Sequence, residues 1–245
     1  MNIAGASDRG YLRANNQDSY TIQRTSDAVL AVVCDGIGGA RAGDVASSVA
    51  CRMMDEQFIT KQTFNNLDDV RQWLKSAIAQ VNQHIVALSR NIEDYQGMGT
   101  TMVAALITPF GIVCANVGDS RIYAVSDRLV LLSDDHTLVN ELVKLGKISI
   151  EDAQRHPNRN MLTNAIGIGF QIDIDVFDIE ESYDYLLLCS DGLHGYVDMG
   201  DVVTEILGNK DVESKVKELI LLANQSGGYD NTTVILCELR GEGHE

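Results

Sequence analysis

The chain has 245 residues, 45% of them hydrophobic, so it can bury a substantial core without disulfides or structural metals. Its formal net charge is -16, from 35 acidic and 19 basic residues, and no basic stretch offsets it, which argues against nucleic acid or an anionic membrane as a partner. We expect no membrane span, because no apolar run approaches about 20 residues, and no signal peptide in the polar N-terminal residues.

The first half of the chain predicts a buried strand and two helices. Residues 28–35, AVLAVVCD, form a short run rich in β-branched side chains, which is typical of a buried strand. After a glycine-rich segment, residues 43–58 carry apolar positions at helical spacing. Residues 68–88 do so over a longer stretch, where apolar residues recur at steps of three and four.

From Thr100 onward the pattern changes to short apolar runs separated by turn-like residues. The runs that we predict as an antiparallel meander cover residues 100–108, 111–119, 121–125 and 128–133. The later elements are a polar, partly helical stretch over 138–164, strands over 173–179, 184–191 and 231–239, and a helix over 212–224. Along the sequence, the predicted helices and strands occur in groups of one kind instead of alternating strictly. This predicts an α+β fold with two antiparallel sheets in a sandwich and helices outside, rather than a doubly wound parallel sheet.

The cysteines are odd in number and show no C-x-x-C spacing. We interpret them as buried, reduced packing residues. Reduced cysteines indicate a reducing compartment, so we expect the protein to be cytoplasmic. The residues are Cys34, Cys51, Cys114, Cys189 and Cys237.

Aspartates recur directly after apolar strands. Asp35 follows VVC, Asp119 follows ANVG and Asp191 follows LLLCS, so each carboxylate is expected at a sheet edge. Asp230 in GGYDN and Asp18 in NNQDS complete the set. Any one of them is also explained as an ordinary turn former. If strands bring them to one rim, their repulsion requires cations, and oxygen ligands suit Mg²⁺ or Mn²⁺.

The motifs occur in an order that resembles bacterial protein phosphatase 2C, the metal-dependent Ser/Thr phosphatases. The segments that carry the resemblance are RANNQDS, VVCDGIGGARAGDVAS, GMGTTMVAALI, ANVGDSRIY, DDHTLV, LLLCSDGL and GGYDNTTVIL. They span the chain from Asp8 to about Leu236. The resemblance implies a four-layer α-β-β-α sandwich, formed by a single phosphatase domain over residues 1–240 with a tail at 241–245.

By resemblance, most of these aspartates would bind metal. Asp35 would bridge two Mn²⁺ or Mg²⁺ ions, and the backbone carbonyl of Gly36 would bind one of them. Asp191 and Asp230 would complete the shell of the first ion. Asp119, together with Asp191, would hold a third and weaker ion.

The resemblance also implies catalytic roles for Arg13, Asp18 and Asp35. Arg13 would bind phosphate through its guanidinium fork, although it could also be a solvated surface charge. Asp18 would lie in the outer shell, hydrogen-bonded to water on the metals. The metal-bridging water would attack the phosphomonoester directly. In agreement, the C-x₅-R loop of tyrosine phosphatases is absent.

One residue departs from the family pattern. Many bacterial members have a histidine after the paired glycines, where this chain has Ala40. A histidine there could protonate the leaving group. The departure motivates an alternative function, a catalytically weak regulatory module that binds phosphoproteins. A further alternative, a two-metal phosphodiesterase or nuclease, is disfavoured by the acidic balance.

Residues 138–164 match the family's flap subdomain, and KLGKIS and RHPNRN make them a local basic island. They would either select substrates or serve as a solvated connector. The resemblance implies phosphorylated proteins as substrates, a Ser/Thr protein kinase as a partner, and a monomer. We expect His136 to organise the loop into the flap, Asn231 to shape the Asp230 turn, and Trp73 to pack in the core. His194 belongs to no constellation that the sequence reveals.

Overall fold

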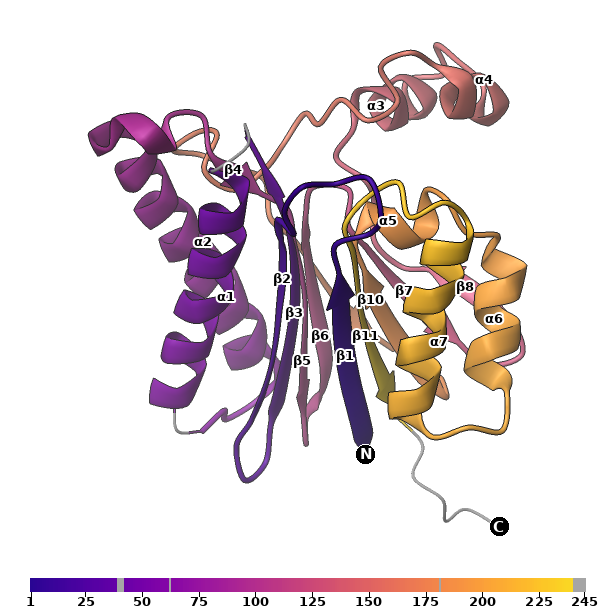
Figure 1. Cartoon of the computed structure of the whole chain (residues 1–245). Coiled ribbons are helices and arrows are strands. Elements are labelled where there is room, and N and C mark those ends of the chain that lie inside the picture. The colour runs from indigo at the N-terminus through magenta and orange to yellow at the C-terminus, as the bar shows by residue number, and fades with distance from the viewer. Residues whose placement is uncertain (39–41, 62, 181, 240–245) are drawn as a thin grey trace.

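The computed structural model describes residues 1–38, 42–61, 63–180 and 182–239. Ala40 and the tail expected at 241–245 lie outside these residues. Two antiparallel sheets lie face to face, and helices cover the outer face of each (Figure 1). The expected α+β fold, a four-layer α-β-β-α sandwich, is therefore confirmed.

Each sheet combines strands from distant parts of the chain. In spatial order, one sheet contains β1 (Asn2–Asp8), β11 (Thr232–Glu238), β10 (Tyr185–Cys189), β7 (Arg121–Val125) and β8 (Leu129–Leu131). The other contains β2 (Asp18–Arg24), β3 (Val29–Ile37), β5 (Met102–Thr108), β6 (Gly111–Val117) and β9 (Asp175–Ile179), with β4 (Gly99–Thr100) paired to β3. The last strand in sequence thus lies between the first strand and β10.

The helices form two outer layers and one projecting pair. The long helices α1 (Gly43–Thr60) and α2 (Leu67–Asn91) cover the sheet that contains β3; the other sheet is covered by α5 (Asp191–His194), α6 (Met199–Leu207) and α7 (Val212–Gln225). The short helices α3 (Leu138–Lys144) and α4 (Ile150–Arg155) stand above one end of the sandwich (Figure 1). A 3₁₀ turn covers Glu93–Tyr95. In the described parts of the chain, no helix combines the length and the apolar character that a membrane crossing needs.

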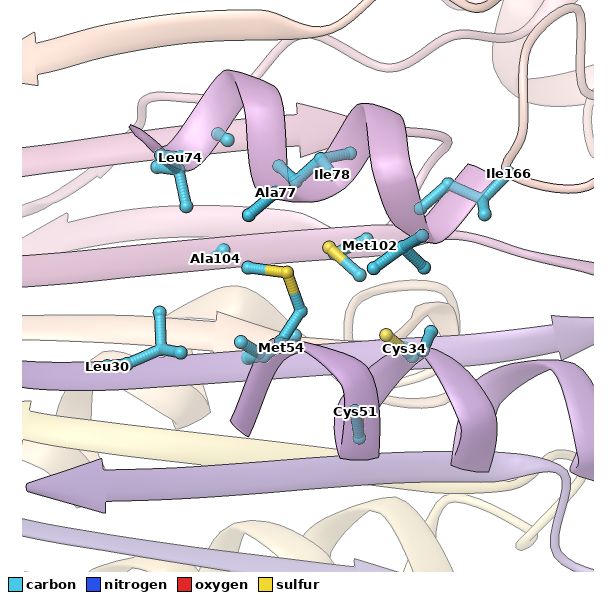
Figure 2. Packing of buried hydrophobic residues seen from close by; sticks show 14 of the residues in the cluster. Leu30, Cys34, Cys51, Met54, Leu74, Ala77, Ile78, Met102, Ala104 and Ile166 are labelled. Carbon is cyan, nitrogen blue, oxygen red and sulfur yellow. The ribbon is translucent and has the colours of Figure 1, made fainter. Parts of the chain in front are cut away.

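The continuous apolar run of β3 is explained by burial on both of its faces. Leu30, Val32 and Cys34 pack under α1 and α2, whereas Ala31 and Val33 pack against the other sheet. Figure 2 shows the helix side of this arrangement, with Met54 and Cys51 of α1 beside Leu30 and Cys34. All five cysteines are free and buried, as predicted.

The helices predicted over residues 43–58, 68–88 and 212–224 are confirmed as α1, α2 and α7. Helix α2 begins at a side-chain cap, because Asn66 accepts a hydrogen bond from the Asp69 N–H at 2.9 Å. Trp73 packs edge-on against Phe58 and Phe64, with ring centroids 6.0 and 5.7 Å away, so its predicted core role is confirmed.

Two hairpins of the predicted meander, β5–β6 and β7–β8, are confirmed, but the prediction that all four strands form one meander is wrong. Strand β6 pairs with β5 and β9, whereas β7 pairs with β10 and β8, so residues 118–120 carry the chain from one sheet to the other. Gly118 allows this crossing through its φ of +106°. Strands β1 and β2 and helix α6 were also not predicted, and Asp191 opens a short helix instead of ending a strand.

Candidate active site

The five aspartates singled out in the sequence lie at one end of the sandwich. Asp18 begins β2 and Asp35 lies near the end of β3, while Asp119 follows β6. Asp191 begins α5 directly after β10, and Asp230 lies just before β11. Burial, followed by the charges of the other four aspartates, raises the pKa of Asp35. The other four carboxylates are therefore within electrostatic reach of Asp35.

Asp18 and Asp35 are directly opposed in the antiparallel pair of β2 and β3. Oδ2 of Asp18 accepts a hydrogen bond from Ser190 Oγ at 2.7 Å, and Thr233 N–H donates to the same Oγ at 2.9 Å. Oδ1 of Asp18 is buried and has no hydrogen-bond partner among the described residues. An unsatisfied buried oxygen beside a second carboxylate is unfavourable unless a cation lies nearby.

Two consecutive threonines fix the backbone of Asp35. The Asp35 N–H donates to Thr101 Oγ1 at 3.0 Å, and the Thr101 N–H donates to the Asp35 carbonyl at 2.8 Å. Thr100 Oγ1 donates to the same carbonyl at 2.8 Å. Sequence reasoning missed Thr101 and Ser190 as supporting residues, although both lie inside the quoted motifs.

The environment also raises the pKa values of Asp191, Asp119 and Asp18. Burial, and then the charges of Asp119 and Asp230, raise the pKa of Asp191 to about 8. Burial is also the main cause that raises the pKa values of Asp119 and Asp18, each to about 6. These shifts show that the cluster carries more negative charge than its surroundings solvate well.

Two glycines let other backbone segments approach the aspartates closely. A Cβ on Gly36 would lie 2.1 Å from the Gly43 carbonyl oxygen, at the start of α1. A Cβ on Gly192 would lie 1.9 Å from the carbonyl oxygen of Asn231, the neighbour of Asp230. The glycines after Asp35 and Asp191 are thus required by packing at this end of the sandwich.

Arg13 reaches the cluster from the loop after β1. Its Nη2 donates to Asp230 Oδ2 at 2.6 Å, and about half of the Arg13 side chain is exposed. The structure therefore pairs the predicted phosphate-binding residue with a predicted metal ligand.

Asn231 holds this loop in place. Its Nδ2 donates to the carbonyl oxygens of Arg9 at 2.9 Å and Asn15 at 3.0 Å, and its Oδ1 accepts from the Gln17 N–H at 2.8 Å. Asn231 thus does more than shape the Asp230 turn. It connects the C-terminal part of the site to the loop that carries Arg13.

A cleft of about 590 Å³ lies between the flap and the carboxylate cluster. Its walls include Asp119 and Asp191 on the sandwich, Val143 and Arg159 on the flap side, and Tyr196 after α5. A substrate could therefore approach the aspartates along the flap.

The base of the flap is fixed by polar contacts to the sandwich. Arg121 makes a two-pronged ion pair with Asp135, with an Nη2–Oδ2 distance of 2.7 Å. His136 Nδ1 accepts from the Gly118 N–H at 3.1 Å and lies 2.8 Å from Asn164 Nδ2, while its Nε2 lies 3.0 Å from Asp175 Oδ2. The organising role predicted for His136 is consistent with these contacts.

His194 lies beside the candidate site, whereas the sequence analysis assigns it to no group of functional residues. Its Nε2 lies 3.0 Å from the backbone carbonyl oxygen of Asp119, and burial, with the charge of Arg121, lowers its pKa to about 3. His194 is therefore neutral at physiological pH and braces the turn that carries Asp119. It is the third residue after Asp191, which is the signal that could have identified it.

The oxygen atoms that the site offers suit divalent cations chemically, but they are not arranged as a complete set of ligands. Its members are carboxylate oxygens, which suit Mg²⁺ and Mn²⁺, and the unpartnered Oδ1 of Asp18 lies among them. Within the described ranges, no group of three or more His, Cys, Asp or Glu side chains is arranged to hold an ion as it stands. One of these carboxylates, Asp230, is already paired with the Arg13 guanidinium at 2.6 Å.

Known proteins with similar sequences and structures are phosphatases. The family model described as Protein phosphatase 2C matches residues 11–228. The chain is 38% identical to "Serine/threonine phosphatase stp" of Listeria monocytogenes over 241 residues, which cover 97% of this chain and 96% of that one. It is 35% identical to "Protein phosphatase PhpP" of Streptococcus pneumoniae over 249 residues, which cover both chains fully.

Solved structures agree with these sequence matches. The crystal structure of serine/threonine phosphatase Stp1 from Staphylococcus aureus superposes with a TM-score of 0.91 at 33% identity, over 98% of this chain and 95% of that chain. A structure described as a bacterial serine phosphatase gives a TM-score of 0.93 at 33% identity and covers both chains fully. Fold, motif order and family match lead to the same conclusion: the chain belongs to the protein phosphatase 2C family.

Proposed function

We propose that the protein hydrolyses phosphoserine and phosphothreonine in proteins, with Mn²⁺ or Mg²⁺ bound by its aspartates. The observation that carries this proposal is the convergence of Asp35, Asp119, Asp191 and Asp230 beside the guanidinium of Arg13. A cluster of carboxylates alone would repel a phosphate. Divalent ions would invert the local potential and make a phosphate-bearing substrate acceptable.

In this proposal the ions would be held by the carboxylates of Asp35, Asp191 and Asp230 and by the backbone carbonyl of Gly36. Asp119 together with Asp191 would hold a further ion. When bound, the ions activate water and neutralise charge on the phosphoryl group. All of these ligands are oxygens, as hard divalent cations require.

The chain's own groups position the substrate and the water. When substrate binds, the Arg13 guanidinium leaves Asp230 and binds two phosphoryl oxygens together through its planar fork. Asp18 keeps Oδ2 on the Ser190 hydroxyl, so its free Oδ1 can accept a hydrogen bond from water at the site. The hydrogen bonds between the Asp35 backbone and the hydroxyls of Thr100 and Thr101 hold Asp35 in place when its neighbours are charged.

The test is phosphate release from a phosphothreonine peptide, with Mn²⁺ and with EDTA. We expect turnover only with the metal, and a loss of about 100-fold or more in Asp230→Ala. Asp127→Ala is the matched control, because Asp127 is exposed in the turn between β7 and β8, at the opposite end of β7 from Asp119. A phosphodiester substrate measured in parallel distinguishes a two-metal phosphodiesterase.

Absence of turnover from folded, metal-loaded wild type would favour the alternative function, a catalytically weak module that binds phosphoproteins. Replacing Ala40 with histidine would then test whether the missing acid limits the rate. Equal activity in EDTA would overturn the metal dependence.

We further propose that the substrates include proteins modified by a Ser/Thr protein kinase, and the kinase itself. The free, buried cysteines support a reducing compartment, the cytoplasm. We propose a monomer. Light scattering on the purified protein tests this, and a concentration-dependent dimer would contradict it.

A further inference from the structure

Three tyrosines and a leucine form an exposed apolar surface beside the carboxylate cluster. We call this surface the tyrosine rim; its members are Tyr11, Leu12, Tyr196 and Tyr229, and their exposed fractions are 66%, 67%, 37% and 51%. None of them has a role in the proposed chemistry. Large apolar side chains that gather on a surface often mark a binding site.

The rim is continuous with the candidate site. Leu12 directly precedes Arg13, and Tyr229 directly precedes Asp230. Tyr196 lines the cleft between the carboxylate cluster and the flap. A molecule held at Arg13 and Asp230 therefore has the rim as its immediate surroundings.

The backbone holds the rim in one arrangement. The rings of Tyr196 and Tyr229 lie against each other, with centroids 5.4 Å apart and planes inclined by 34°. The loop after β1 and the loop between α7 and β11 lie side by side (Figure 1), joined by a hydrogen bond of 2.8 Å from the Tyr11 N–H to the Gly228 carbonyl.

Two glycines make this close packing possible. A Cβ on Gly227 would lie 2.2 Å from the Tyr229 ring, and a Cβ on Gly228 would lie 2.8 Å from Cδ2 of Tyr11. Both glycines have positive φ values, +125° and +54°. The aromatic rings are therefore positioned before any ligand binds, which lowers the entropic cost of binding.

Charges surround Tyr196 on more than one side. Its side chain is within electrostatic reach of Asp191, Asp230 and Arg13, and also of Arg159 at the end of the flap. Its hydroxyl forms no hydrogen bond within the part of the chain that the structure describes. Tyr196 thus lies between the phosphate site and the flap and offers its ring to the cleft.

We propose that the tyrosine rim determines specificity by binding an apolar side chain next to the phosphorylated residue of a protein substrate. This inference rests on the proposed function. An extended chain advances about 3.3–3.6 Å per residue, so the neighbours of a phosphothreonine held at Arg13 lie over the rim. The paired rings of Tyr196 and Tyr229 favour an apolar contact, and the nearby aspartates disfavour an acidic one.

The experiment compares two phosphothreonine peptides, one with leucine and one with glycine on both sides of the phosphothreonine. For wild type we expect kcat/KM to be about tenfold higher with leucine, mainly through a lower KM. Tyr229→Ala and Tyr196→Ala should bring the ratio of the two peptides close to one. Tyr229→Phe and Tyr196→Phe should restore it, because the ring and not the hydroxyl makes the contact.

Phe110→Ala is the matched control, since Phe110 is a similarly exposed aromatic residue in the turn between β5 and β6, away from the site. It should keep the wild-type ratio. A wild-type ratio near one, or alanine variants that keep the preference for leucine, would overturn the role of the rim. A loss that is equal for both peptides and for p-nitrophenyl phosphate would also overturn it, because that pattern indicates a structural defect.

Binding of a non-hydrolysable phosphonate analogue of the leucine peptide separates this inference from the proposed function. One outcome is that wild type binds the analogue about tenfold more tightly than the alanine variants do but releases no phosphate from the hydrolysable leucine peptide. The rim is then supported and the proposed hydrolysis fails. If wild type turns the peptide over and the variants bind the analogue equally well, hydrolysis is supported and the rim fails. Failure of both readouts overturns both.

Discussion

Asp18 and Asp35 face each other across β2 and β3, so the sheet holds two carboxylates in register at its functional end. Like charges in directly opposed positions destabilise a strand pair. Asp35→Asn should therefore stabilise the metal-free protein by about 1 kcal/mol while abolishing phosphatase activity. Thermal unfolding in EDTA at pH 7.5 measures the first effect, and phosphate release measures the second.

The exposed Asp127 again provides the control, because Asp127→Asn removes a charge without relieving a facing carboxylate. It should leave both quantities unchanged. A metal-free Asp35→Asn protein that unfolds below the wild-type temperature would contradict the repulsion that we infer.

The same cluster predicts how the stability of the metal-free protein depends on pH. Burial, then neighbouring charge, raises the pKa of Asp191 to about 8, above the 3.8 of an unperturbed aspartate. The native state then holds a proton that the unfolded state has lost, so the stability from this group disappears as pH rises through its folded pKa. The free energy of unfolding in EDTA should fall between pH 7 and pH 9.

His194 opposes this trend only at lower pH. Its pKa of about 3 lies below its usual 6.5, so the stability that it contributes is present above pH 6.5 and is lost on acidification. Measurements from pH 7 upward therefore avoid it. Asp191→Asn should flatten the slope, and an unchanged slope in that variant would assign the titration to another group.

Gly192 is predicted to set the position of Asp230 through the backbone. Because a Cβ there would lie 1.9 Å from the Asn231 carbonyl oxygen, Gly192→Ala must displace the turn that carries Asp230. We expect a loss of about 2 kcal/mol in stability and a weaker Mn²⁺ affinity. Calorimetric titration with Mn²⁺ measures the affinity.

Gly169→Ala is the matched control, because the nearest atom to its added Cβ is 3.4 Å away, an ordinary contact. Tight Mn²⁺ binding by Gly192→Ala would show that the turn adapts and that the glycine serves packing alone.

His136 is predicted to secure the flap. His136→Ala leaves the Gly118 N–H without its 3.1 Å acceptor and removes the 3.0 Å contact to Asp175. A buried N–H that loses its hydrogen-bond acceptor lowers the folding stability by about 1–3 kcal/mol. We expect faster proteolytic cleavage between α3 and α4, and a higher KM for phosphopeptides. His84→Ala, at an exposed position on α2, should behave as wild type; equal cleavage rates in both variants would refute the role.

The sequence predicts which aspartates lie together better than it predicts the topology. Asp35 and Asp191 each follow a strongly apolar strand, and the identity and order of these motifs indicate both the fold and the residues that converge. Strands β1 and β2 lack such a signal, because NIAGASD and DSYTIQR mix small and polar residues and one of their faces is partly exposed. Their pairing partners lie far away in sequence or across a turn, so only tertiary contact identifies them as strands.

The supporting contacts of the site are harder to predict for a different reason. Arg13 pairs with Asp230 across more than 200 positions, and Asn231 bonds to three backbone groups of the loop after β1. No local pattern specifies such contacts. They depend on β11 lying beside β1, which hydrophobic periodicity alone does not determine.

The position of β11 has a consequence for the moment at which activity first arises. Among the described strands β11 is the last in sequence, yet it lies between β1 and β10 in its sheet. Until it inserts, Asn231 cannot hold the Arg13 loop and Asp230 cannot join the other aspartates. A folding intermediate in which β11 has not yet inserted would therefore lack the proposed site, so the docking of this one strand is the step that completes it.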